Sequence, residues 1–223
     1  HNAGAEYMLH AILSNLIQYD FECKVGVRGA LAQKEPYSID GVEVGNVDSL
    51  ENVDIIISHL HLSNTASLFA KLKHKKFVLL SHNSFGYGKI KGCDLAVYNT
   101  EYLKDNAPVP NAKNSIVVHP PVWPELYKVN STREYITLIN LCREKGGEML
   151  FKIAELLPDH KFLGVVGAYG EQIVRPVLNV DLMQNQKNIR EVYKKTKILL
   201  MPSEYESYGR VAIEASMSGI PVI

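Results

Sequence analysis

The chain has 223 residues, enough for one or two domains with a sizeable core, and 46% of them are hydrophobic. Lysine plus arginine (24) equals aspartate plus glutamate (24), so the net charge gives no general argument for a nucleic-acid partner. Three widely spaced cysteines, Cys23, Cys93 and Cys142, argue against a disulfide framework or a cysteine-rich zinc site and favour a reducing compartment. No apolar run predicts a membrane-spanning helix.

Helix-like and strand-like segments alternate through the first half of the chain. Met8, Leu9, Ile12, Leu13, Leu16 and Ile17 follow helical spacing after a group of small residues. Further helices are predicted at 66–74 and 101–106. Strands are predicted at 23–27, 54–60, 76–82, 94–100 and 114–120.

The prolines of PPVWPELYKVNSTRE, residues 120–134, predict a linker, after which the alternation restarts. Strands are predicted at 135–140, 161–167 and 197–203, with a last one beginning at 221–223; helices are predicted at 147–157, 188–196 and 209–218. Apolar strands between amphipathic helices indicate parallel sheets covered on both faces. We therefore expect an α/β fold with two lobes, residues 1–121 and 122–223, facing across a cleft. The abrupt HNAGAEYML and GIPVI ends suggest a fragment cut at both ends.

Strand exits are the positions where open α/β sheets bind ligands. One such exit, NLCREKGGEML, places Lys145 and two glycines between a strand and a helix. Glycines let the backbone approach a ligand, and a helix N-terminus with a lysine favours an anion. We interpret this segment as a phosphate site; the alternative is a solvated lysine beside a flexible turn.

A second exit, PSEYESYGRVAIEA at 202–215, carries two glutamates, Glu206 and Glu214, on either side of Gly209. Arg210 and Glu214 are four residues apart, so the plain interpretation is an ion pair on a helix surface. The functional interpretation is that amides and carboxylates at this helix start bind a hydroxyl-rich, phosphorylated ligand.

The longer stretch PSEYESYGRVAIEASMSGIPVI resembles the signature of retaining glycosyltransferases of family 4 (group 1), which have the GT-B fold. That signature is a Glu, seven intervening residues and a second Glu, followed by small residues and Gly-x-Pro-Val. The stretch from TLINLCREKGG resembles the start of the family's second domain, and AGAEYMLHAILSNL the first helix of its first domain. Ile139 and Asn140 stand where the family often has Gly-Arg, whereas Lys145 matches.

The resemblance implies two Rossmann-like lobes, an acceptor-side domain at 1–121 and a nucleotide-sugar-binding domain at 122–223. It assigns Glu206 to the donor sugar and Glu214 to the ribose hydroxyls, and it makes His82 a candidate beside the transferred sugar. The implied catalytic set is His82, Lys145 and Glu206. The implied donor-binding set is Asn140, Lys145, Gly146, Glu206, Ser207, Tyr208, Gly209, Arg210 and Glu214, and the acceptor-side set is Gly4, Ala5 and Glu6.

Three further features have plainer explanations. His82 can instead cap a strand end by hydrogen bonding. His59 and His61 lack a third metal ligand, so a structural role is favoured. The basic cluster KLKHKK at 71–76 is typical of a solvated helix end, with a weak membrane-surface contact as a further hypothesis.

We therefore expect a retaining, metal-independent hexosyltransferase that uses a nucleotide diphosphate sugar, with no cofactor and no bound metal. Its acceptor is a glycan, a lipid or a small molecule, and no nucleic-acid partner is expected. We expect a cytoplasmic protein, with the inner face of a membrane as a further hypothesis. The alternatives are a non-catalytic nucleotide-binding fragment and a GT-B sugar-nucleotide epimerase. VVGAYG at 165–170 lacks G-x-G-x-x-G, which disfavours a nicotinamide dehydrogenase.

Overall fold

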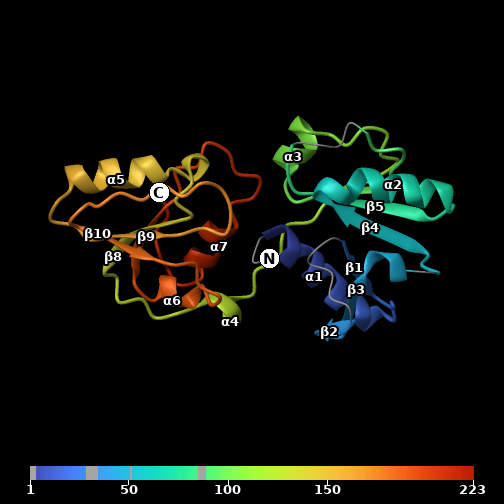
Figure 1. Cartoon of the computed structure of the whole chain (residues 1–223), viewed down its shortest axis with the longest axis horizontal. Helices are drawn as coiled ribbons and strands as arrows, with labels where there is room; N and C mark the ends of the chain where they lie inside the picture. The colour runs from blue at the N-terminus through green and yellow to red at the C-terminus, as the bar shows by residue number, and fades with distance from the viewer. Residues whose placement is uncertain (1–3, 29–34, 51, 85–88) are drawn as a thin grey trace. The chain divides into compact units, whose positions relative to one another are not determined.

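The computed structural model describes residues 4–28, 35–50, 52–84 and 89–223. These residues form two compact units, Gly4–Pro121 and Val122–Ile223, which we call the first and the second unit. Each unit contains a parallel sheet with helices packed on it (Figure 1). The predicted α/β fold with two Rossmann-like parallel sheets is confirmed.

The first unit has its main sheet in the order β4-β5-β6-β7, and all of its strands are parallel. A separate sheet has the order β1-β3-β2, in which β2 runs antiparallel to β3. The predicted strand at 23–27 therefore belongs to a small second sheet. The described elements are α1 (Gly4–Leu16), η1 (Ile17–Tyr19), β1 (Lys24–Val27), β2 (Tyr37–Ile39), β3 (Val42–Asn46), η2 (Val47–Ser49), β4 (Ile55–His59), η3 (Leu60–Leu62), α2 (Ser63–Leu72), β5 (Lys76–Ser81), β6 (Leu95–Tyr98), α3 (Glu101–Asn106) and β7 (Ser115–Val117).

The core of the first unit follows from the two-residue period of its strands. Phe77 and Leu79 of β5 point to the side covered by Ala70 of α2 and Leu103 of α3. Their neighbours Val78 and Leu80 point to the opposite side, where Met8, Leu9 and Ile12 of α1 pack. Both faces of the sheet are thus buried, and this explains the nearly continuous apolar run of β5.

The second unit has the sheet order β10-β9-β8-β11, again with all strands parallel. Its described elements are α4 (Pro124–Tyr127), β8 (Tyr135–Ile139), η4 (Arg143–Lys145), α5 (Gly147–Leu156), β9 (Phe162–Val165), β10 (Val180–Met183), α6 (Arg190–Tyr193), β11 (Thr196–Leu200) and α7 (Arg210–Ser216). The chain end joins this sheet beside β11, where Leu199 and Val222 form a parallel bridge.

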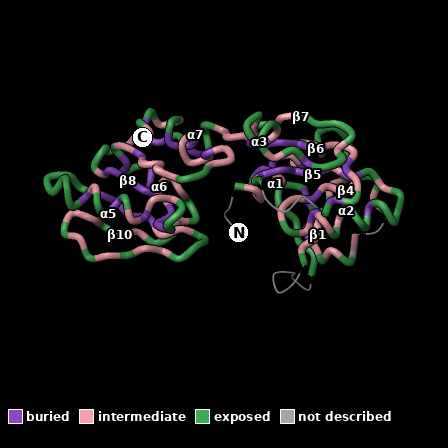
Figure 2. The backbone as a smooth tube through the Cα atoms, turned by 90° about the horizontal axis from the view of Figure 1, so that it is seen from above, coloured by how far each residue is buried: buried purple, intermediate pink, exposed green. Residues whose placement is uncertain are grey.

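Helices cover both faces of the second sheet as well. Leu150 and Ala154 of α5 pack on the side of Ile136 and Leu138. The other side is covered by Tyr193 of α6 and Ala215 of α7. In both units the buried residues concentrate on the central strands (Figure 2).

The segment predicted as a linker, residues 120–134, is partly built into the second unit. It forms the short helix α4, and its Tyr127 and Val129 lie buried in the same cluster as Tyr193 and Leu199. A helix can form in this proline-containing segment because Pro124 occupies the first turn of α4, where a proline costs no helical hydrogen bond. Among the described helices the longest, α1, has 13 residues, and none is long and apolar enough to cross a bilayer.

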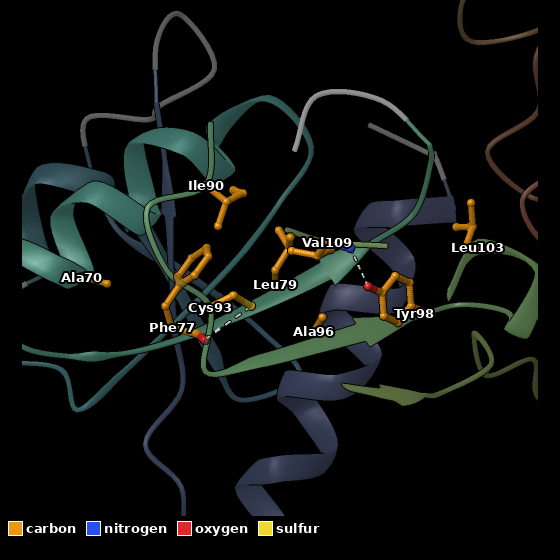
Figure 3. Packing of buried hydrophobic residues seen from close by; sticks show 9 residues of the cluster. All are labelled: Ala70, Phe77, Leu79, Ile90, Cys93, Ala96, Tyr98, Leu103 and Val109. Carbon is orange, nitrogen blue, oxygen red and sulfur yellow. Dashed lines mark hydrogen bonds between the residues drawn. The ribbon is translucent and has the colours of Figure 1, made fainter. Parts of the chain in front are cut away.

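Tyr98 gives a test of the first core (Figure 3). Its buried hydroxyl accepts a hydrogen bond of 2.7 Å from the backbone N–H of Val109. Tyr98→Phe leaves that buried N–H without its acceptor, so we expect the free energy of unfolding to fall by about 2 kcal/mol. Urea unfolding measures the loss. The exposed Tyr19→Phe is the matched control, and an equal effect of the two substitutions would contradict the assignment.

Candidate functional site

The candidate site of the second unit lies where the strand order of its sheet reverses. From β8 the chain passes through α5 to β9 on one side, whereas β11 lies on the other side of β8. Helix α5 packs on one face of the sheet and α7, which follows β11, on the other. The loops after β8 and β11 therefore diverge from neighbouring strand ends, and such a point is where open α/β sheets bind ligands.

These two loops bring Lys145 and Glu206 together. Lys145 Nζ donates to Glu206 Oε1 in an ion pair whose side chains are 20% and 26% exposed. Ser203 Oγ donates to the same oxygen at 2.7 Å. The backbones are joined as well, because Glu204 N donates to Glu144 O at 3.2 Å. A cation and a carboxylate predicted from separate strand exits thus form one half-buried charged pair.

Gly146 allows the two loops to approach closely. Its φ of +87° is left-handed, and a Cβ built on it would lie only 2.4 Å from Cγ of Pro202. A larger residue would therefore be strained and would also push Pro202 away. Its position explains why a glycine follows Lys145 at this turn.

The amides of this turn are largely used inside the turn itself. Gly146 N donates to Arg143 O at 2.9 Å, and Gly147 N donates to Cys142 O at 3.1 Å. We expected helix-start amides near Gly146 to bind an anion, but these two N–H groups already donate to backbone carbonyls. The ammonium of Lys145, which the loop holds beside Glu206, is a group whose chemistry suits a phosphate.

Asn140 directly follows β8 and has a left-handed backbone, with φ of +70°. Its Oδ1 accepts from Cys142 N at 3.2 Å and from Gln172 Nε2 at 2.8 Å. Gln172 also accepts from Leu141 N and from Gly167 N, so it links the loops after β8 and β9. Asn140 Nδ2 is buried and has no hydrogen-bond partner among the described residues, so it is a donor available to a ligand.

Glu214 lies in a buried network rather than on a helix surface. Arg210 Nε donates to Glu214 Oε1 at 2.6 Å, and the hydroxyl of Tyr193 donates to Oε2 at 2.8 Å. Arg210 also donates to the hydroxyl of Tyr127 at 2.7 Å. Burial raises the pKa of Glu214, and the hydrogen bonds from Tyr193 and Arg210 act against that shift. The Arg210–Glu214 pair forms as its spacing suggested, but the surface location was wrong, since the two side chains are 13% and 8% exposed.

The remaining predicted donor residues precede α7. Gly209 takes a left-handed φ of +72°, which turns the chain into this helix. Ser207 and Tyr208 are half-buried in the loop, and burial raises the pKa of the Tyr208 hydroxyl.

The first unit holds a second polar cluster at the carboxyl ends of β4 and β5. The rings of His59 and His82 meet edge to face, with centroids 5.3 Å apart. Burial and the neighbouring charge of His59 lower the pKa of His82 to about 4. Glu6, in the first turn of α1, acts electrostatically on His59 and opposes the lowering of the His59 pKa that burial causes. Ala5 and Gly4 lie beside Glu6 at the start of α1, Ala5 half-buried and Gly4 exposed.

Sequence reasoning did not identify several members of these clusters. His59, for which a structural role was favoured over metal binding, lies against His82. Ser203 could have been found, because it is the last residue of the strand predicted at 197–203. No sequence signal pointed to Gln172, Tyr193 or Tyr127, which come from other segments of the fold. In the described part of the chain no three His, Cys, Asp or Glu side chains gather as a metal site requires.

Residues 130–223 match the family model described as glycosyl transferases group 1. D-inositol 3-phosphate glycosyltransferase of Mycobacteroides abscessus is 32% identical over 93 residues, which cover 35% of this chain and 21% of that protein. Sucrose-phosphate synthase from Thermosynechococcus elongatus has a similar fold, with a TM-score of 0.77, 13% identity, and coverage of 99% of this chain and 75% of that one. Alr3699/HepE of Anabaena, in complex with UDP-glucose, gives a TM-score of 0.65 at 17% identity, over 76% and 58% of the two chains.

The alignment thus spans about a fifth of the curated relative and 58% of the HepE chain. The solved structures share the fold, and the family match lies in the second unit, which carries Lys145, Glu206 and Glu214.

The two glutamates should differ in their effect on stability. Glu214→Gln leaves the buried guanidinium of Arg210 without its carboxylate, so we expect the free energy of unfolding to fall by about 3 kcal/mol. Glu206→Gln breaks a more exposed pair and should cost about 1 kcal/mol. Urea unfolding of both variants measures the difference, and equal losses would contradict the buried network.

His82 should make stability depend on pH. Its folded pKa of about 4 lies below its usual value of 6.5, so the unfolded chain binds the extra proton between these values. Its contribution is therefore complete above about pH 6.5 and is lost as the pH falls towards about 4. His82→Gln should reduce this acid destabilisation by roughly 3 kcal/mol.

Chemical unfolding at several pH values measures this effect, with the exposed His160→Gln as the control. Superimposable pH profiles of the wild type and His82→Gln would rule out a depressed His82 pKa.

Proposed function

We propose that the protein is a retaining, metal-independent glycosyltransferase that moves a hexose from a nucleotide diphosphate sugar. The observation that carries this proposal is the convergence of Lys145, Glu206 and Ser203 at the strand-order reversal of the second unit. The family match over 130–223 and the UDP-glucose complex of a fold neighbour support a nucleotide sugar as the donor.

In this proposal the donor's diphosphate takes the ammonium of Lys145 away from Glu206. The carboxylate of Glu206, still held by Ser203, then accepts hydrogen bonds from the hydroxyls of the sugar. Asn140 contributes its buried Nδ2 donor. Ser207, Tyr208 and Gly209 line the phosphate side of the donor at the start of α7, with Gly146 giving room beside Lys145.

The ribose is assigned to Glu214 and Arg210. Both oxygens of Glu214 already accept hydrogen bonds from protein groups, so ribose hydroxyls would use the lone pairs that Arg210 and Tyr193 leave. In this assignment the hydrogen bonds from Arg210 and Tyr193 orient the carboxylate of Glu214 before the ribose binds.

The chemistry follows from where charge develops. Breaking the bond between the anomeric carbon and the phosphate oxygen leaves an oxocarbenium-like sugar and a nucleoside diphosphate that gains negative charge. Lys145 stabilises that charge directly, which removes the requirement for a divalent cation. The acceptor hydroxyl attacks the same face and passes its proton to the departing phosphate, so the anomeric configuration is retained.

The acceptor is assigned to the first unit. His82 has a depressed pKa, so at neutral pH it is an uncharged imidazole suited to hydrogen bonding a hydroxyl. Gly4, Ala5 and Glu6 form the acceptor side, and the acceptor is a glycan, a lipid or a small molecule. We place the protein in the cytoplasm with a peripheral contact to the inner face of a membrane.

A second candidate is a non-catalytic nucleotide-binding fragment. A third is a GT-B sugar-nucleotide epimerase. Product analysis separates the three, because transfer gives a glycosylated acceptor, epimerisation gives an isomerised sugar nucleotide, and the fragment gives neither.

Lys145→Ala tests the donor site. Removing the ammonium should reduce nucleoside diphosphate release by about a hundredfold, because one charge that stabilises the leaving group is lost. The thermal shift produced by UDP, GDP or ADP should shrink in parallel. A panel of donors and acceptors, with and without EDTA, provides the activity measurement, and EDTA should leave the rate unchanged.

Lys152→Ala, at an exposed position of α5, is the control for the loss of a lysine. Wild-type activity in Lys145→Ala would remove the phosphate assignment. Activity that EDTA abolishes would remove the metal-independent mechanism.

A further inference from the structure

Helix α2 of the first unit turns apolar side chains towards solvent. It packs on β4 and β5 (Figure 1). Its buried residues are Ser63, Ser67 and Ala70. On the outward side Leu68, Phe69 and Leu72 are 44%, 43% and 68% exposed. Single exposed apolar residues are common on proteins, but these three lie within about one turn of a single helix and form a stripe.

A cavity of about 260 Å³ adjoins the last turn of this helix. It lies at the starts of β5 and β6, the edge opposite to His82 at the end of β5, and is therefore separate from the acceptor cluster. Its lining includes Ser67, Ala70, Phe77, Gly92 and Cys93, together with one acidic residue, Asp94, and the basic residues Lys71, His74, Lys75, Lys91 and Lys113.

The charge of this cavity is strongly positive. Asp94 is fully engaged, since it accepts from Lys113 at 2.8 Å and from Phe77 N at 3.0 Å and lies 3.6 Å from Lys76. No ion pair joins Lys71, Lys75 or Lys91 to an acidic side chain in the described parts of the chain. Several lysines held around one hollow without counter-charges repel each other, and an anion would relieve that repulsion.

Lys71 lines the cavity and directly precedes Leu72 of the stripe in the sequence, so the cavity lies next to the end of the stripe. An apolar stripe flanked by lysines is the pattern of a helix that lies in the interface of a membrane, with its apolar side chains in the headgroup region. Lysines near an anionic bilayer are attracted to its surface. The cavity next to the stripe offers several ammonium groups to a phosphate.

We propose that this face of the first unit docks on an anionic phospholipid bilayer: Leu68, Phe69 and Leu72 enter the interface, and the basic cavity receives a headgroup phosphate. The proposal builds on the peripheral membrane contact suggested above and names its surface. Its test reads lipid binding rather than sugar transfer, so its failure leaves the proposed transferase activity standing.

The test is co-sedimentation of the whole chain with vesicles of phosphatidylcholine, with and without phosphatidylglycerol. The wild type should bind the anionic vesicles and release them at high salt. Changing Lys71, Lys75 and Lys91 to Gln should weaken binding by about fivefold for each lysine. The exposed pair Leu68→Ser and Leu72→Ser should weaken it by about tenfold.

The matched control changes three exposed lysines of the second unit, Lys152, Lys187 and Lys197, to Gln, which alters the net charge equally. It should bind vesicles like the wild type, and all variants should keep the wild-type thermal shift with UDP. Equal weakening in the control, or no binding of wild type to anionic vesicles, would overturn the proposal. Saturable binding of glycerol phosphate without vesicle binding would overturn it too, because the cavity would then serve a soluble phosphate.

Discussion

The reversal of strand order between β8 and β11 is the constraint on which the candidate donor site depends. Crossovers between parallel strands are right-handed. The helix that connects β8 to β9 therefore lies on one face of the sheet. The helix that follows β11, on the other side of β8, lies on the opposite face. Helices α5 and α7 obey this rule, and the loops that precede them leave the ends of the neighbouring strands β8 and β11 side by side. Lys145 and Glu206 each stand in one of these loops, so their meeting follows from topology and not from their distance of 61 residues along the chain.

The pair that results is suited to exchanging partners. Each side chain is partly exposed, and a lone charge at that depth would be costly, so the pair compensates both charges when no ligand is bound. In the proposed function a diphosphate replaces the carboxylate at Lys145, and sugar hydroxyls replace the ammonium at Glu206. Glu214 differs, because its partners Arg210 and Tyr193 are buried protein groups that a ligand cannot replace without leaving a guanidinium unpaired. In the proposal one glutamate of the motif therefore exchanges its partner for a ligand, whereas the other keeps its hydrogen bonds to Arg210 and Tyr193.

The sequence predicted the central strands β5, β8 and β9, because each reads as an apolar run of the right length. It missed β2, β3 and β10, because β2 is exposed, β3 alternates buried and exposed residues, and two of the four residues of β10 are exposed, so none of them gives a continuous apolar run. It also missed α4, which at four residues is too short to show a helical period. Lys145 and Glu206 could be predicted because each follows a predicted strand. Their ion pair could not, because it depends on which strands are neighbours. The spacing of Arg210 and Glu214 predicted that they meet, but not that Tyr127 and Tyr193 cover them, since those residues come from α4 and α6.

Because the chain has equal numbers of acidic and basic residues, its net charge gives no information about its binding partners. That balance holds only for the whole chain. A binding partner interacts mainly with charges within about one Debye length, roughly 8 Å, of its own charges. At the amino edge of the first sheet a single aspartate, Asp94, stands among five basic side chains and is already paired, so the local field is positive despite a neutral total. In the second unit, by contrast, the lysine of the candidate site is matched by a glutamate. The first unit therefore carries an excess of basic side chains at this edge, whereas the candidate site of the second unit is a balanced ion pair. Composition alone does not distinguish these two local environments.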